Sequence, residues 1–518
     1  MSKYSAKLMT EGSIWKRIVA FAIPLFWGNL FQQLYNTADS LIVGNFLGSS
    51  ALAAVSSSGN LIFLMVGLFN GIAIGSGVIV AKYYGARDIP NLQKSIHTTV
   101  GFGLICGVIL TIVGIIAAPQ ILVLMGTPEA VLPNSITYFR IYFTGSLAFV
   151  MYNFFVGILQ SVGDSTHPLI YLIVSSVTNI ILDLVLIAGL GFGVGAAAFA
   201  TVISQFLSAI LCMVQLLHSP EEFRLHLNRI NLDSYMLRQI ISYGLPAGLQ
   251  NSIISLANVF VQANINQFGE MAVAGCGSYM KIQGFGFLPI TCFALALTTF
   301  ISQNLGAKEY ERAKKGAVFG VICSLTISEL LGICVHFTAP QLLSAFSSTA
   351  EVIRYGTMQA HTDTFFYFLL AFSHCMAGIM RGAGKSTVPM YVMLVCWCLI
   401  RVSYIVIILK LTINFIINYV LHCFSDLFSK VRLDTRTGKI NSTNLYLTHR
   451  IQKTITGSDE ITSLLQWFSF ILTHIQFLTA VSVLFPLFIH SYFRFVKNTE
   501  MFPVYFDQPV FLHLPKLI

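Results

Sequence analysis

Two aspartates in the N-terminal half of the sequence have the residue types and spacing of a small cation site. Each follows a polar residue by four positions, Asp39 after Tyr35 and Asp183 after Asn179. An i,i+4 spacing places both members of a pair on one face of a helix. Thr201 supplies a further oxygen from its own apolar stretch. Such a cluster can coordinate a small cation or share a proton, because burial and a neighbouring negative charge both favour the protonated carboxyl group.

Asp39 and Asp183 lie in apolar stretches, where acids are rarely found. A carboxylate near the middle of a membrane costs roughly 2.5–3.5 kcal/mol on insertion scales, so its presence there indicates a function. The two acids are about eight and about seven residues from the outer ends of their predicted spans, which places them at similar depth at 1.5 Å per residue. The competing interpretation is that one acid only hydrogen-bonds to backbone at a helix break.

The composition indicates that these stretches lie in a lipid bilayer. Hydrophobic residues make up 55% of the 518 residues and charged residues only 10%, and the mean hydropathy is +0.76. A soluble domain of this composition could not cover its apolar surface with polar groups. Because a spanning helix needs roughly 20 apolar residues, the first 410 residues divide into about eleven spans, and no removable signal peptide is expected. The spans run near 17–47, 51–81, 95–117, 136–160, 168–190, 194–217, 237–268, 271–303, 316–338, 353–380 and 388–410.

Basic residues between the spans predict the orientation of the chain. Most of them lie on one side of the predicted membrane, and the opposite loops carry little charge. Because cytoplasmic loops are enriched in lysine and arginine, this side and the N-terminus are expected to face the cytoplasm. The net charge of +9 follows from this topology and gives no reason to expect nucleic acid as a partner. The residues concerned are Lys3, Lys7, Lys16, Arg17, Lys82, Arg87, Lys94, Arg224, Arg229, Arg238, Lys308, Arg312, Lys314 and Lys315.

Three short motifs recur at a constant distance of 221 positions, which indicates a tandem duplication. The pairs are 118–120 with 339–341, 85–87 with 306–308, and 163–168 with 384–389. Six spans in each half mean that both halves enter the membrane in the same sense, related by a pseudo-two-fold axis along the membrane normal. The expected fold is an all-α polytopic membrane protein of two six-helix bundles, with about twelve transmembrane helices.

The sequence RGAGKSTVP at 381–389 resembles the end of a nucleotide-binding P-loop but fails its spacing. The motif needs a glycine five positions before Gly384, and that position is Ile379. The other copy of the repeat has Asp164 in place of Lys385, and an aspartate cannot neutralise phosphate. We interpret both copies as turns in which glycine ends one helix and Ser-Thr-x-Pro caps the next. No nucleotide is expected to bind.

Six motifs in consecutive order resemble the multidrug and toxic compound extrusion (MATE) family. They are GNLFQQLYNTADSLIVGNFLG, VAKYYGARD and QSVGDSTHP in the first half, and GLPAGLQNSI, ISQNLGAKE and MRGAGKSTVP in the second. The resemblance covers about residues 10–410. It implies a secondary antiporter with two six-helix lobes that exports amphiphilic, often cationic compounds. The coupling ion would be H+ or Na+, and no other cofactor is implied.

The DinF-type branch of this family implies a site built from the same acids. There, a tyrosine and an aspartate on the first helix and an asparagine and an aspartate on the fifth form the cation or proton site of the N-terminal lobe. The matching residues are Tyr35, Asp39, Asn179 and Asp183, with Asn153 and Thr201 as further expected members. Sodium would need several converging oxygen ligands, and a proton only one acid, so both ions remain open.

The second half departs from this acidic pattern. Its counterpart of Asp183 is Tyr404, with Arg401 nearby, and Glu329 has no identifiable partner. Lys281 is expected either to face the cleft between the lobes or to extend towards the membrane surface. The candidates for a substrate cleft are Asn258, Gln262, Lys281 and Asp363. The amides of the seventh span can also serve only to join helices. The sequence shows no metal-ligand or catalytic set, so the protein is not expected to be an enzyme.

The predicted organisation has four parts. They are an N-terminal lobe at 1–217, a cytoplasmic linker at 218–236, a C-terminal lobe at 237–410 with helices seven to eleven, and a tail at 411–518 with a possible twelfth helix. The tail has Gly438 and Gly457 as its only glycines and Ala480 as its only alanine. A twelfth span of this family is usually richer in both residues, so the tail is atypical.

Two other functions fit parts of the pattern. A flippase of a lipid-linked precursor would share the fold, but its cleft would need cationic residues for a pyrophosphate group. Lys281, Arg381 and Arg401 are too few and too scattered for that role. An ATP-driven pump or membrane enzyme lacks its P-loop and its catalytic residues. We therefore expect a monomer in a bacterial plasma membrane whose partners are lipid and a small amphiphilic molecule.

Overall fold

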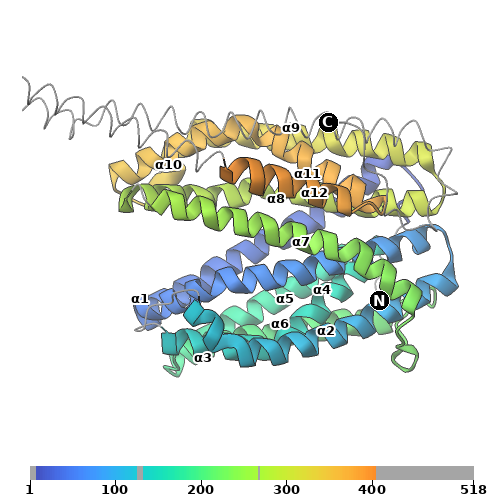
Figure 1. Cartoon of the computed structure of the whole chain (residues 1–518), viewed down its shortest axis with the longest axis horizontal. Helices are drawn as coiled ribbons and strands as arrows, with labels where there is room; N and C mark the ends of the chain where they lie inside the picture. The colour runs from blue at the N-terminus through green and yellow to red at the C-terminus, as the bar shows by residue number, and fades with distance from the viewer. Residues whose placement is uncertain (1–7, 125–131, 267–268, 404–518) are drawn as a thin grey trace, which may run out of the picture.

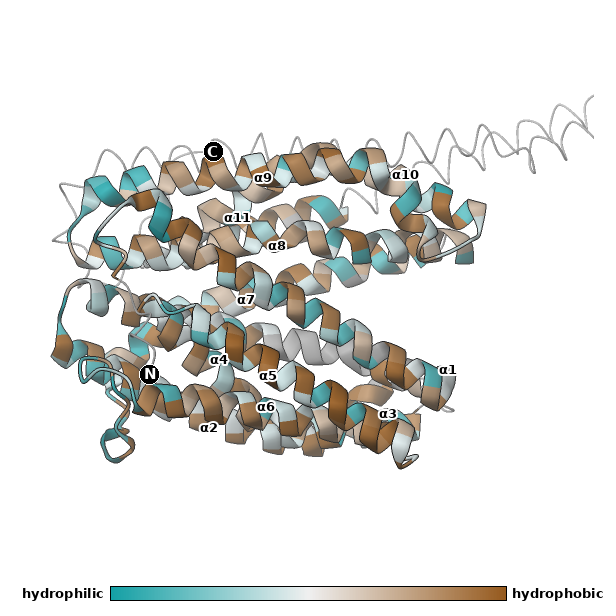
Figure 2. Cartoon of the chain, turned by 180° about the vertical axis from the view of Figure 1, so that it is seen from behind, coloured by the Kyte–Doolittle hydropathy of each residue, from teal (hydrophilic) through white to brown (hydrophobic). Residues whose placement is uncertain are grey.

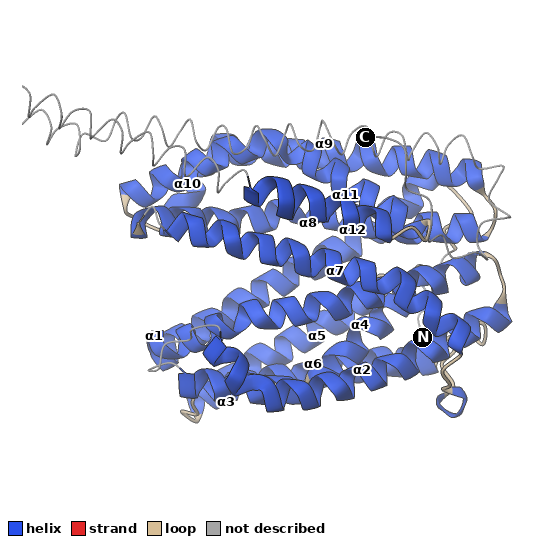
Figure 3. Ribbon diagram, in the orientation of Figure 1, coloured by secondary structure: helices blue, strands red, loops and turns tan. Residues whose placement is uncertain are grey.

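The structure is a computed structural model that describes residues 8–124, 132–266 and 269–403, and this part of the chain is helical without a β-strand (Figure 3). The first half contains α1 (Ile14–Gly85), α2 (Ile89–Leu124), α3 (Leu132–Thr144), α4 (Ser146–Ser161), α5 (Thr166–Asp183) with its π-helical end η1 (Leu184–Gly189), and α6 (Val194–Leu217). The second half contains α7 (Ser234–Ile265), α8 (Glu270–Gly306), α9 (Tyr310–Ser344), α10 (Ala350–Asp363), the 3-10 turn η4 (Thr364–Phe366), α11 (Tyr367–Gly382), α12 (Thr387–Met393) and the π-helical η5 (Leu394–Ile400). A short 3-10 turn, η2 (Leu227–Arg229), lies in the linker. The predicted tail and Tyr404 lie outside the described residues.

Glycines set the limits of the spans in the first half. Gly48 has φ 84° and interrupts α1 between the spans predicted near 17–47 and 51–81. The span predicted near 136–160 is two helices, α3 and α4, bent by 47° at Gly145. Within the described ranges, seven helices are long and apolar enough to cross a membrane, or eight if α3 and α4 count as one span. The chain is therefore a multi-pass membrane protein.

Large apolar side chains cover the outside of the molecule. On α2, Ile109, Ile112 and Ile116 are 55%, 52% and 66% exposed, and their spacing places them on one face of the helix. Figure 2 shows hydrophobic residues along most of the helix length and hydrophilic residues gathered in loops at the helix ends. Such faces are stable against lipid and would be unstable against water.

The backbone confirms the tandem duplication. Arg87 and Lys308 are repeat partners, and among the described non-glycine residues only these two have positive φ, 55° and 63°. Gly163 and Gly384 are also repeat partners, with φ of 89° and 75°. Each of these glycines ends a helix, as expected from the sequence. The two halves therefore share their turn geometry as well as their motifs.

The capping of the next helix differs from the prediction. Ser165 and Ser386 stand at the N-caps of α5 and α12, but neither side chain makes a capping hydrogen bond. In the first copy the cap is Asp164, whose Oδ1 accepts from the backbone N–H groups of Thr166 and His167 at 3.2 Å. Its Oδ2 lies 2.5 Å from Nδ1 of His167. The second copy has Lys385 at this position, which cannot accept these bonds. The predicted serine caps are therefore wrong. In the first copy, the carboxylate of Asp164 takes the place of the hydroxyl group of Ser165.

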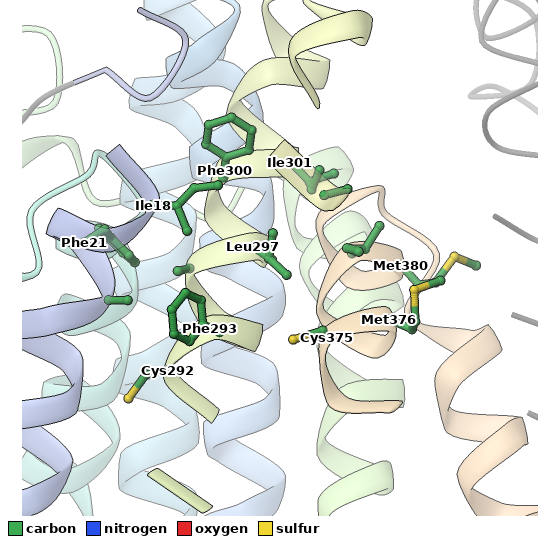
Figure 4. Packing of buried hydrophobic residues seen from close by; sticks show 14 of the residues in the cluster. Ile18, Phe21, Cys292, Phe293, Leu297, Phe300, Ile301, Cys375, Met376 and Met380 are labelled. Atoms are coloured by element: carbon green, nitrogen blue, oxygen red, sulfur yellow. The ribbon is translucent and has the colours of Figure 1, made fainter. Parts of the chain in front are cut away.

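The helices form two lobes, and α1 contributes to both (Figure 1). The second leg of α1 packs with α2, α4 and α6 in two apolar clusters of the first half. The start of the first leg instead packs with the second half, because Ile18, Phe21 and Leu25 share a buried cluster with residues of α8, α9 and α11. The end of this leg packs in the first half, where Ile42 and Val43 share a cluster with residues of α3 and α6. Figure 4 shows Ile18 and Phe21 beside Phe293, Leu297 and Phe300 of α8. The chain thus starts on the C-terminal lobe and crosses to the N-terminal lobe within its first helix.

A close seam joins the lobes at one end of the molecule. A Cβ added to Gly75 would lie 2.3 Å from Cα of Gly244, and a Cβ added to Gly85 would lie 2.0 Å from the carbonyl oxygen of Gln303. No side chain fits in such contacts, so glycine allows the two backbones to touch. We call this end the basic end, because it carries the turns with Arg87 and Lys308 that follow α1 and α8.

Candidate functional site

The predicted cation site lies in the N-terminal lobe, on α1 and α5. Tyr35 and Asp39 are on the first leg of α1, and Asn179 and Asp183 are on the last two turns of α5. Asn179 and Asp183 are buried, and Asp183 is 0% exposed. Asp183 is the last α-helical residue before the π-helical turn η1. Turns of this kind are frequent at functional sites, because the wider turn changes the direction of the neighbouring side chains.

The carboxyl groups of Asp39 and Asp183 lie close enough to interact electrostatically. Both oxygens of Asp183 and Oδ1 of Asp39 are buried and receive no bond from a donor group within the described ranges. Oδ1 of Asn179 is also buried and receives no hydrogen bond within the described ranges. Ionised carboxylates have only acceptors, and two neighbouring negative charges disfavour each other, so a proton or a cation near the pair would stabilise it. The arrangement is therefore a set of buried oxygens suited to a positive charge.

Two tyrosines that the sequence analysis did not select also belong to this site. Tyr138 and Tyr142 of α3 are one helical turn apart, with ring centroids 6.2 Å from each other. Tyr138 is in electrostatic contact with Tyr35 and with both aspartates, and Tyr142 is in contact with Tyr35. The only signal in the sequence was their i,i+4 spacing. That spacing is common for aromatic residues in membrane helices, so it did not distinguish them.

The two additional predicted members differ in position. Oγ1 of Thr201 lies 3.5 Å from Nδ2 of Asn179, so α6 is joined to the site by a long hydrogen bond. Oγ1 of Thr201 also donates to the carbonyl of Ala197 at 3.0 Å. Nδ2 of Asn153 donates to the carbonyl of Phe149 in its own helix at 2.8 Å. Thr201 thus contacts the cluster, whereas the described contact of Asn153 is local.

The candidates of the C-terminal lobe separate into a cluster and two isolated residues. Arg401 donates to Oδ1 of Asn258 at 3.1 Å and is in electrostatic contact with Asp363. Gln262 bonds instead to Asn266 in its own helix at 2.9 Å. Lys281 is exposed, and its Nζ lies 5.7 Å from the ring of Phe346, beyond the end of α9. Asn258, Asp363 and Arg401 therefore form a polar group from three separate spans.

Glu329 has a partner, contrary to the prediction. Its Oε2 accepts from the backbone N–H of Phe368 at 3.1 Å. Phe368 lies in the first turn of α11, directly after the 3-10 turn η4 that breaks the tenth span. The carboxylate thus satisfies a backbone donor that the break would leave unpaired inside the membrane. Sequence analysis missed this contact because η4 has no proline or glycine to announce the break.

A two-lobed, duplicated helical fold of this kind is found in membrane transporters. The family model described as MatE matches residues 24–185 and 246–407, one segment in each half. The chain therefore belongs to the MatE family, the multidrug and toxic compound extrusion transporters, and is not an enzyme.

Individual relatives and solved structures agree with this family. The chain is 31% identical over 387 residues to a probable multidrug resistance protein, YoeA, of Bacillus subtilis, which covers 73% of this chain and 84% of the relative. A probable multidrug resistance protein, NorM, of Thermotoga maritima is 25% identical over 73% of this chain and 82% of its own length. The fold superposes with a TM-score of 0.74 and 25% identity on a structure titled as the outward-facing conformation of a multidrug resistance MATE family transporter, over 79% of this chain and 91% of that one.

Proposed function

We propose that this protein is an ion-coupled antiporter that exports amphiphilic, often cationic small molecules in exchange for H+ or Na+. The observation that carries the proposal is the electrostatic interaction of Asp39 with Asp183, whose buried carboxyl oxygens have no donor partner within the described residues. The names of the relatives, which are multidrug resistance proteins, support small amphiphilic molecules as the cargo.

The charge of the carboxyl pair couples the movement of the cation to the movement of the cargo. A proton or Na+ that arrives from outside neutralises the pair, and the lobe then packs around the neutral form. A cargo contact that depended on the charged form is weakened, so the cargo is released. Reciprocal linkage requires that bound cargo weaken the binding of the cation by the same factor. Tyr35 and Tyr138 interact electrostatically with both acids, so they influence how much of the charge of the pair is stabilised without the cation.

Either ion fits the side chains at this site. Sodium is a hard cation that prefers several oxygen ligands, and the site offers the carboxyl, amide and hydroxyl oxygens of Asp39, Asn179, Asp183 and Thr201. A proton requires only that one of the two carboxyl groups be neutral. Efflux measured at fixed pH with sodium replaced by choline separates the two ions. Loss of efflux without sodium identifies Na+, and unchanged efflux identifies H+.

The basic end, with Arg87 and Lys308, would face the cytoplasm of a bacterial cell, because positively charged loops are retained there. The seam of close backbone contacts at Gly75 and Gly85 lies at this end. Asp39 lies near the end of the first leg of α1, and Asp183 lies at the end of α5. The pair is therefore towards the opposite side. This arrangement supports uptake of the cation from outside while the cytoplasmic side is closed.

Uptake of ethidium by everted membrane vesicles tests the proposal directly. An imposed ion gradient should drive accumulation, and an ionophore that collapses the gradient should abolish it. ATP should have an effect only through the ATPases that maintain the gradient. Accumulation that requires ATP hydrolysis and ignores the gradient would contradict ion-coupled antiport. A lipid-linked pyrophosphate is the weaker candidate cargo, because Arg401 is already compensated by Asp363.

A further inference from the structure

Residues 8–13 form a short non-helical segment ahead of α1, which we call the strap. The strap lies against the ends of α8 and α9 at the basic end of the molecule. Met9 is buried in the same apolar cluster as Phe300 of α8 and Ala313 of α9. Gly12 has φ 75°, a left-handed conformation that only glycine adopts without strain. The segment therefore has a defined conformation and a defined place.

Arg312 of α9 holds the strap through its backbone. Its guanidinium donates to the carbonyl of Met9 at 3.0 and 3.1 Å, to that of Glu11 at 3.0 Å and to that of Gly12 at 2.7 Å. Three carbonyls converge on one guanidinium because its five N–H groups form a planar fork. A lysine has no such fork and cannot reproduce the arrangement. The contact thus depends on this residue type and hardly at all on the side chains of the strap.

The strap also fixes the side chain of Gln303, which bridges the lobes. Gln303 of α8 is 0% exposed, and its Oε1 accepts from the N–H of Met9 at 2.8 Å. This bond directs its Nε2 to the carbonyl of Ser161 in α4 at 2.6 Å. The neighbouring Ser302 donates to the carbonyl of Val78 in α1, also at 2.6 Å. The amide of Gln303 is therefore held by the strap on one side and by the N-terminal lobe on the other.

The ion pair of the strap is weak. Glu11 and Arg87 lie 2.7 Å apart, but their side chains are 59% and 70% exposed. Exposed pairs of this kind contribute little to stability. The strap is thus held mainly by hydrogen bonds that involve its backbone, to Arg312, Gln303 and Asn304.

We propose that the strap keeps the lobes closed at the basic end. Arg312 and Met9 position Gln303 so that its amide joins the two lobes there. When the lobes part there, the bond between Gln303 and Ser161 must break. Without the strap, a buried amide oxygen of Gln303 would lack its donor even in the closed form, which destabilises that form. Release of the strap and separation of the lobes at the basic end are therefore one event. The proposal depends on the transporter fold and is independent of which ion is coupled.

Pulsed electron paramagnetic resonance tests whether the strap keeps the basic end closed. Nitroxide labels on Ala86→Cys and Lys315→Cys, in a background with the native cysteines replaced by serine, report the separation of the lobes in lipid nanodiscs. Both positions are exposed, one on each lobe. We expect Arg312→Gln and Gly12→Ala to raise the ratio of the long-distance to the short-distance population, by about fivefold for the strained backbone of Gly12→Ala.

The control variants carry similar substitutions at positions that do not hold the strap. Lys314→Gln removes a charge two residues further along α9, where Lys314 pairs with Glu311. Gly191→Ala places a side chain on another positive-φ glycine, φ 68°, with open space around it. Both should retain the distances of the parent. Parent-like distances in Arg312→Gln and Gly12→Ala, or equal opening in the controls, would overturn the proposal. If Arg312→Gln fails to fold, Gly12→Ala decides alone. The distances are measured without an ion gradient, so failure of ion-coupled efflux leaves this result intact.

Discussion

Asp39 of α1 and Asp183 of α5 interact electrostatically, although they are distant in the chain. No lysine, arginine or histidine within the described residues forms an ion pair with either of them. We therefore expect a bound proton or cation to neutralise the pair. This relationship makes the two acids the first target for substitution.

Asp39→Asn and Asp183→Asn should each abolish gradient-driven efflux, because an amide cannot bind and release a positive charge. Expression and thermal stability should remain near those of the parent, since the substitution removes a buried charge. Ethidium efflux and the melting temperature of the purified protein measure both effects. Lys385→Ala is the matched control, because the side chain is exposed and the turn has no nucleotide to hold. Normal transport by both asparagine variants, with a dead Lys385→Ala, would require the nucleotide hypothesis to be considered again.

Tyr138→Phe should weaken the apparent affinity for the coupling ion by about two- to tenfold, the range of roughly 0.5–1.5 kcal/mol for a lost hydrogen bond or polar contact. The ring remains, so packing in α3 is preserved. The measurement is efflux rate as a function of pH and of sodium concentration. Tyr391→Phe is the control, because Tyr391 is 61% exposed on α12 and lies outside the site. An unchanged ion dependence in Tyr138→Phe would exclude Tyr138 from the site.

Asp363 and Arg401 should show strong coupling in a double-mutant cycle. Asp363→Asn or Arg401→Gln alone leaves one charge in the C-terminal lobe without compensation, which is destabilising. The double variant removes both charges and should recover part of the loss, with a coupling energy of about 1–3 kcal/mol. Unfolding of the purified proteins in detergent measures the four members of the cycle. Additive effects would mean that the contact contributes nothing to the stability of the lobe.

Gly75→Ala should destabilise the closed seam, because its Cβ would lie 2.3 Å from Cα of Gly244 and neither backbone can move away freely. Overpacking of this kind costs about 1–3 kcal/mol. Gly277→Ala in α8 is the control, since a Cβ there meets nothing within 4 Å and alanine favours the helix. Melting temperatures should fall for Gly75→Ala and stay equal or rise for Gly277→Ala. A parent-like melting temperature for Gly75→Ala would show that the two helices are not in close contact.

The two copies of the turn predict opposite effects of exchanging their residues. Asp164→Ala should lower stability by about 0.5–2 kcal/mol, because α5 loses its cap. Lys385→Asp should raise stability, because it provides α12 with the acceptor that Asp164 provides for α5. Thermal unfolding measures both variants. A destabilised Lys385→Asp would show that the second turn differs from the first in its backbone around Ser386.

The sequence was sufficient for the periodic features of the fold. The apolar spans, the repeat at 85–87 and 306–308, and the pairing of Tyr35 with Asp39 all follow from local patterns, because helical spacing and hydropathy are local properties. The electrostatic interaction of Asp39 with Asp183 was also predictable from depth, since both acids are at similar distances from the outer ends of their spans.

Contacts between distant spans were less accessible. Arg401 and Asp363 interact electrostatically across two spans, and neither has a local pattern that identifies its partner. Glu329 caps a break that the sequence of the tenth span does not reveal. The start of α1 lies on the second lobe because of how Ile18 and Phe21 pack, and an apolar helix face does not tell which surface it will cover.

Because the start of α1 packs against the opposite lobe, a polypeptide cut in the linker between α6 and α7 would leave neither piece self-sufficient. The N-terminal piece would expose the apolar side chains of Ile18, Phe21 and Leu25, and the C-terminal piece would expose the apolar surfaces of α8, α9 and α11 that cover them. We expect each piece made alone to be degraded, and the two made together from separate genes to reassociate. The duplicated halves thus depend on each other for folding.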